Sequence, residues 1–171
     1  MEGSATIADG RDYVERYMSD GCDCPCCDQY CKLYRRELNS GMGYALCLIR
    51  RYFLENPTER WCHVEDYLKT LDFVPTSVRS RYYSLLRFWG LIEPKTGTKD
   101  DGNPRTGYWR ITDRGVRFVE GKINVPRYVL IYNNQFRGFW KADEYRTTLR
   151  RALEKKFNYQ DVMASAFDDI R

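Results

Sequence analysis

Five cysteines fall within ten positions, Cys22 to Cys31, and they are the residues of this chain whose type and spacing point most directly to chemistry. Within this cluster, Cys24-Pro25-Cys26-Cys27 has the C-P-x-C spacing of a zinc-knuckle turn. Proline presets the backbone there, and the two-residue gap lets two thiolates reach one tetrahedral ion. A structural zinc site needs four ligands. The candidate metal ligands are therefore Cys24 and Cys27, completed from Cys22, Cys31 and His63, the only histidine of the chain.

Three interpretations of the cluster stay open. Four local cysteines would make a compact structural zinc site, whereas a site completed by His63 would pin the N-terminal arm to the rest of the protein. Alternatively, the cysteines are free thiols and His63 is a hydrogen-bonded, partly buried residue. Redox catalysis is disfavoured, because the pair does not lie between a strand and a helix as in thioredoxin-like proteins.

The composition bears on the compartment. The first twenty residues have no apolar segment of the secretory type, and no run of eighteen apolar residues occurs anywhere. Seven cysteines, an odd number, also argue against a disulfide framework. We therefore expect a cytoplasmic protein that does not bind a membrane and whose clustered cysteines hold zinc.

The charge is distributed unevenly along the chain. Residues 77–117 carry nine Lys and Arg against four Asp and Glu, whereas residues 1–76 carry nine against thirteen. A basic segment of this kind is typical of a surface that binds a polyanion such as nucleic acid.

The pattern of apolar residues predicts an α+β fold, mainly helical, in three parts. Residues 1–39 form an arm with the cysteine knuckle. Residues 40–121 read as helix, strand, helix, helix, strand, polar loop, strand and helix, which is the order of a winged helix-turn-helix. Residues 122–171 add a β-hairpin at 127–140, with Asn133-Asn134 at its turn, and an amphipathic helix at 143–157.

Two stretches carry a resemblance to known families. "LRFWGLIEPK" and "GYWRITDRGVRFVEG" resemble the last helix, the wing and the closing helix of winged-helix regulators of the MarR and PadR type. More broadly, C-P-x-C, "K-x-Y-R-R-x-L-N-S-x-M", "WGLIE" and "VPRYV-x-IYNN" resemble a group of phage-encoded winged-helix proteins to which no activity is attached. The resemblance implies a DNA-binding fold in a host cytoplasm, with the knuckle pair and a histidine near position 63 as recurrent features.

The helix expected at 77–89 is the candidate DNA-reading element. An inward stripe of Val78, Tyr82, Leu85, Leu86 and Trp89 would leave a polar face outward. Arginine there would bond guanine, hydroxyls would reach phosphates, and basic wing residues would clamp the backbone. The predicted DNA-contacting residues are Arg79, Ser80, Tyr83, Ser84, Arg87, Lys95, Lys99 and Arg105. A second basic run, Lys32, Arg35 and Arg36, either extends this surface or is a charged start of a helix.

The sequence does not indicate an enzyme, because it contains no nucleophile–base set and no phosphate-binding glycine loop. We expect a DNA-binding regulator that is not an enzyme and that contacts double-stranded DNA. The alternative is a winged-helix module that binds a host protein. The helix at 143–157 would either pair two chains in a homodimer or pack back on its own domain.

Overall fold

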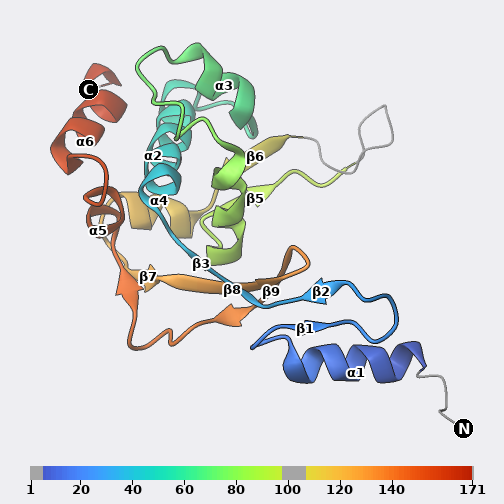
Figure 1. Ribbon diagram of the computed structural model, residues 1–171. Coiled ribbons are helices and arrows are strands. Elements are labelled where there is room, and N and C mark those ends of the chain that lie inside the picture. Colours follow the sequence, from blue (N-terminus) through green and yellow to red (C-terminus); the bar gives the residue numbers. More distant parts are fainter. Residues whose placement is uncertain (1–5, 98–106, 171) are drawn as a thin grey trace, which may run out of the picture.

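The computed structural model describes residues 6–97 and 107–170, and it has the mixed α+β composition expected from the sequence (Figure 1). The helices are α1 (Ile7–Tyr17), α2 (Ser40–Glu55), α3 (Val64–Thr70), η1 (Arg81–Trp89), α4 (Asp113–Val119), α5 (Leu149–Leu153), α6 (Tyr159–Phe167) and η2 (Asp168–Ile170). The strands are β1 (Cys22–Asp23), β2 (Tyr30–Cys31), β3 (Tyr34–Glu37), β4 (Cys62–His63), β5 (Ile92–Pro94), β6 (Tyr108–Ile111), β7 (Val125–Pro126), β8 (Tyr128–Tyr132), β9 (Gln135–Phe139) and β10 (Arg146–Thr147). None of the helices in the described part is long and apolar enough to cross a membrane.

Helix α2 is the centre of the core and confirms the helix expected at 40–54. Most of its residues are buried, and it packs against η1, α4, α5 and α6. Its N-cap is Asn39, whose side chain accepts a hydrogen bond from the N–H of Met42. Ser40, the first residue of α2, donates from Oγ to the carbonyl of Ala152 at 2.7 Å and so joins α2 to α5.

A three-stranded antiparallel sheet with the order β4-β6-β5 lies beside α2 and η1. The strands agree with those expected around the polar loop, and Thr112 caps α4 through a bond from the N–H of Gly115. Gly90 ends η1 in the left-handed conformation (φ 68°), which is common for a glycine at the C-terminus of a helix.

The helix expected at 77–89 is different in form. Residues 75–80 make turns, Ser80 is extended (φ −64°, ψ 150°), and a 3₁₀ helix begins only at Arg81. Because a 3₁₀ helix has three residues per turn, its buried row repeats every third position. Tyr83, Leu86 and Trp89 form that row. Of the predicted stripe, Val78, Leu86 and Trp89 are buried as expected, but Tyr82 is exposed, so its inward placement is wrong.

The hairpin predicted at 127–140 is confirmed. Strands β8 and β9 pair around Asn133 and Asn134, which both have positive φ angles (47° and 59°), as a tight hairpin turn requires. A third strand, β3, pairs antiparallel with β8, from Tyr34 opposite Ile131 to Glu37 opposite Tyr128. The expected arm at 1–39 thus contributes a strand to the C-terminal sheet, which the sequence did not show.

The helix expected at 143–157 is much shorter. Thr147 is buried in β10, which pairs with β7, and Thr148 caps α5 only from Leu149 onward. Two successive β-branched residues favour this extended entry over a continuous helix. Leu149 and Leu153 pack on α2 at Gly43, where an added Cβ would lie 3.4 Å from each of them. Leu149, Ala152 and Leu153, which belong to the apolar face that suggested a homodimer, are thus buried within the chain.

Candidate nucleic-acid interface

The outward face of η1 is not the one predicted. Tyr83 is 5% exposed, its ring meets Trp109 edge-on at 6.2 Å, and burial raises the pKa of its hydroxyl to about 12. Tyr83 therefore belongs to the core, and its assignment as a DNA contact was wrong. Tyr82 is the exposed neighbour, with 59% of its surface accessible.

Arg79 is also held inside the fold. Its Nη2 donates to the carbonyl of Leu71 at 2.8 Å and lies 3.4 Å from that of Asp72. Its Nε is buried and has no hydrogen-bond partner among the described residues. The guanidinium thus ties the loop after α3 to the turn before η1 and does not face outward with Arg81. Ser80, the next predicted contact, donates from Oγ to the carbonyl of Ser77 at 3.0 Å.

Arg87 and Ser84 lie toward the C-terminal hairpin. Arg87 donates from Nη1 to the carbonyl of Ser84 at 3.1 Å and from Nη2 to Oδ1 of Asn134 at 2.9 Å. Its guanidinium also lies 4.4 Å from the centre of the Phe88 ring. Arg87 therefore bridges η1 and the β8–β9 turn.

Of the three predicted wing contacts, one lies among the described residues. Lys95 is exposed just after β5, with its Nζ 5.3 Å from the centre of the Tyr108 ring. Lys99 and Arg105, the other two predicted wing contacts, lie outside the described residues.

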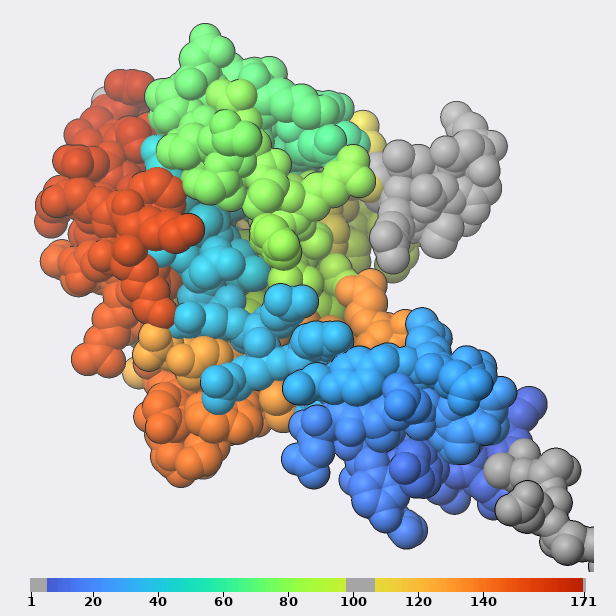
Figure 2. Space-filling view, in the orientation of Figure 1, coloured from blue at the N-terminus to red at the C-terminus, as the bar shows by residue number. Residues whose placement is uncertain are grey.

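A groove of about 480 Å³ runs between η1, β3 and the β8–β9 turn. Figure 2 shows these three segments, drawn in green, blue and orange, meeting on one face of the molecule. The groove is lined by Tyr34, Arg36, Arg81, Tyr82, Ser84, Leu85, Ile131, Asn133 and Asn134.

The walls and the rim of this groove have distinct chemistry. Tyr34 and Tyr82 are 49% and 59% exposed. Arg36 lies 5.5 Å from the centre of the Tyr34 ring, and Arg81 pairs with Glu65 at 3.1 Å while its side chain stays 81% exposed. Arginine and tyrosine side chains in this arrangement suit a nucleic acid, since cations meet phosphates and rings meet bases.

Part of the groove was visible in the sequence. Arg36 belongs to the second basic run and lines the groove, and the two arginines of that run lie in strand β3, not at the start of a helix. Its neighbour Arg35 faces away, with its guanidinium 4.3 Å from the centre of the Trp140 ring and 5.0 Å from that of Tyr128. Tyr34 and the two asparagines were missed as site residues, because only the pairing of β3 with β8 brings them to η1.

The cysteine hairpin lies beside α1, away from the winged part of the chain (Figure 1). In it, β1 and β2 place Cys22 directly opposite Cys31, and the knuckle forms the turn between them. The amide N–H of Asp28 donates to the carbonyl of Cys24 at 2.9 Å and closes this turn. Hydrogen bonds from the backbone of Cys26 and from the side chain of Cys27 hold the pKa of the Cys24 thiol below its ordinary value.

The remaining thiols differ in their surroundings. Burial, together with the charges of Cys31, Asp23 and Cys24, raises the pKa of the Cys22 thiol. Tyr132 donates from its hydroxyl to Sγ of Cys31 at 3.2 Å. Cys26 instead packs against Gly10 of α1. In the described ranges, no group of three or more His, Cys, Asp or Glu side chains is arranged to hold a metal ion.

His63 is not brought to this hairpin. Its Nδ1 lies 2.8 Å from Oδ2 of Asp66, and its ring meets Tyr108 edge-on at 5.1 Å. Gly107, with a φ of 76°, leaves room for the other ring nitrogen, which an added Cβ there would strike. His63 is thus packed within the β4–β6 pair, beside Asp66 and Tyr108.

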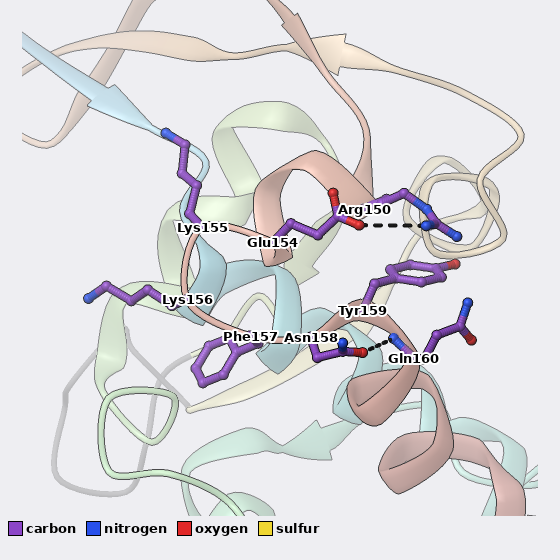
Figure 3. A pocket seen from close by; sticks show the side chains of 8 residues that line it. All are labelled: Arg150, Glu154, Lys155, Lys156, Phe157, Asn158, Tyr159 and Gln160. Carbon is purple, nitrogen blue, oxygen red and sulfur yellow. Dashed lines mark hydrogen bonds and ion pairs between the residues drawn. The ribbon is translucent and has the colours of Figure 1, made fainter.

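A second hollow, of about 500 Å³, lies where α5 joins α6 (Figure 3). Arg150 pairs there with Glu154 at 3.5 Å and lies over the Tyr159 ring at 4.3 Å. Figure 3 shows Lys155 and Lys156 extending away from these residues. Because the charged groups do not converge, this hollow is a weaker candidate than the groove beside η1.

No protein-family model, curated protein or solved structure matches the chain. The functional argument therefore depends on the residues and their geometry.

Proposed function

We propose that residues 40–121 form a winged helix-turn-helix and that the protein binds double-stranded DNA as a regulator. The observation that carries this proposal is the element order α2, β4, α3, η1, β5, β6, α4 with the antiparallel sheet β4-β6-β5. In winged helices this order places the last helix before the β-hairpin in the major groove and the hairpin loop beside it.

The charges of this region support the same conclusion. Residues 77–117 carry nine Lys and Arg against four Asp and Glu, and Arg81 and Lys95 present two of those cations at the surface. Arg36 adds a third from β3. Contacts from these three side chains to phosphates would orient the duplex, because phosphate contacts set register and affinity. Arg79 and Tyr83 keep structural roles in this proposal.

Fluorescence anisotropy with a labelled duplex across a salt series tests the proposal. Arg36→Gln and Lys95→Gln should each weaken binding and lower the slope of log K against log salt by about one. Arg117→Gln is the matched control, since Arg117 is an exposed arginine on α4 outside the groove. Absence of salt-dependent binding by the unaltered protein would reject DNA binding and favour the host-protein alternative.

We also infer that the cysteine hairpin binds one structural zinc ion. The knuckle turn and the lowered pKa of Cys24 suit a thiolate ligand, and Cys27, Cys22 and Cys31 lie in the same hairpin. Zinc there would join the two short strands of the hairpin.

Elemental analysis of protein purified without chelator tests this inference and should give about one zinc per chain. Cys24→Ser should lose the metal, whereas Cys47→Ser, which alters a buried thiol of α2, should keep it. Metal-free protein from both the unaltered chain and the control would reject a zinc site.

A further inference from the structure

The groove beside η1 has features that a duplex-binding surface does not need. Its floor includes Leu85 and Ile131, and Ile131 is only 8% exposed, so the floor is apolar. Two half-exposed tyrosines, Tyr34 and Tyr82, stand over this floor from different elements. A volume of about 480 Å³ lies within the range of cavities that hold small ligands, and apolar walls with a few polar groups are typical of such sites.

The polar groups of the groove are those that recognise a nucleotide. Asn134 lines the groove, and Arg87 donates to its Oδ1, so the amide nitrogen of Asn134 is the group of this side chain that can donate to a ligand. Arg36 and Arg81 lie at the rim, where a phosphate would sit. The carboxylate of Glu65 offsets part of the positive charge of Arg81. Arg36 instead contacts the neutral ring of Tyr34, which does not offset its charge.

Aromatic side chains can stack only on a base whose face is free. In a duplex both faces of each base are covered by its neighbours, whereas an unpaired base offers a face to tyrosine. Two exposed tyrosines over an apolar floor are thus of little use to an intact duplex, and they match an unpaired base.

We propose that this groove binds an unpaired nucleotide, so that the preferred ligand is a nucleic acid with a single-stranded segment next to a duplex. Only the duplex part of this ligand rests on the proposed function, which places η1 against a duplex. Tyr34 and Tyr82 stack on the base, Asn134 donates to it, and Arg36 meets its phosphate.

Anisotropy with three labelled DNA probes tests the proposal: a blunt duplex, the same duplex with a short thymidine overhang, and an oligothymidylate. The unaltered protein should prefer the overhang over the blunt end. Tyr82→Ala and Tyr34→Ala should each weaken overhang binding by about tenfold, a typical loss for one stacking ring, and leave blunt-duplex binding unchanged. Tyr82→Phe keeps the ring and should restore the affinity. Tyr13→Ala, which removes an exposed ring of α1, is the control.

The outcomes separate the two proposals. Duplex binding without any preference for the overhang, or an equal loss on all probes, would overturn the groove assignment and leave the proposed function standing. Binding of oligothymidylate that depends on Tyr34 and Tyr82, without binding of the blunt duplex, would support an unpaired nucleotide in the groove. The same result would reject the proposed binding of double-stranded DNA. An oligouridylate probe then tells whether the strand is DNA or RNA, since only RNA offers a 2′-hydroxyl. Thermal melting should show each variant folded, because both rings are exposed.

Discussion

Adjacent tyrosines of η1 should respond in opposite ways to truncation. The structure buries Tyr83 and exposes Tyr82, whereas an α-helical reading of the same segment predicts the reverse. Replacing each by alanine therefore asks whether the segment winds as a 3₁₀ helix with a three-residue repeat.

The expected magnitudes follow from burial. Tyr83 is 5% exposed and contacts Trp109, so truncation to alanine should cost about 3–5 kcal/mol, the usual cost of removing a buried aromatic side chain. For a chain of 171 residues this corresponds to a fall in Tm of roughly 6–20 °C. Tyr82 is 59% exposed, and its truncation should change the free energy of unfolding by no more than about 0.5 kcal/mol.

Urea unfolding followed by circular dichroism measures both values, and scanning calorimetry supplies Tm. Tyr83→Phe, which keeps the ring, serves as a conservative control and should lose much less stability than Tyr83→Ala. Equal destabilisation by Tyr82→Ala and Tyr83→Ala would refute the three-residue repeat. A larger loss at Tyr82 would restore the α-helical reading and, with it, Tyr83 as an outward residue.

Three further results are expected. Gly10→Ala would place a methyl group against Sγ of Cys26 and should speed amide hydrogen exchange in α1. The double variant Gly10→Ala with Cys26→Ala should restore protection from exchange, because the added methyl group would lie 3.7 Å from Cβ of residue 26. Iodoacetamide at mild alkaline pH should label the exposed Cys26 but not the buried Cys47 or Cys62, because burial raises the pKa of both of these thiols to about 12. Peptide mass mapping checks this, and labelling of Cys47 or Cys62 would contradict it. Burial raises the pKa of Tyr83 to about 12, so the folded protein holds this proton more tightly than the unfolded chain. Stability should therefore fall between pH 10 and 12 by at most about 1.4 kcal/mol per pH unit for this group, and a Tyr83→Phe variant with an unchanged slope would contradict that origin.

Features with a local cause were predictable from the sequence. The run at 40–54 has a helical apolar period and lies after a capping residue, and α2 forms there. Asn133-Asn134 demands positive φ angles between two β-prone runs, and the hairpin turns there. Gly90 follows the last buried residue of η1 and adopts the left-handed conformation.

Features set by partners distant in the chain were not predictable. The segment at 143–148 has helical composition, yet Thr147 pairs with Val125 and the helix starts later. Strand β3 forms because β8 is available to it about a hundred residues further along. The local pattern of one sequence does not show which distant segment will pair with a given segment. Such tertiary pairing overrides the local helix or strand propensity.

The same division applies to the candidate sites. The knuckle spacing places Cys24 and Cys27 in one turn by local geometry alone, and its hairpin adds Cys22 opposite Cys31. The groove is different, because no contiguous stretch contains it.

The sequence by itself determined the order of helices and strands within residues 40–121, the basic character of residues 77–117 and the cysteine turn, since each depends on neighbouring residues. Tertiary structure alone decided which tyrosine of η1 faces outward. It likewise decided that the guanidinium of Arg79 donates to the carbonyl of Leu71 in the loop after α3. It also decided that Tyr34, Arg36 and Asn134 meet η1. The physical reason is that winding, burial and strand pairing depend on what each segment packs against, and those partners come from distant parts of the chain.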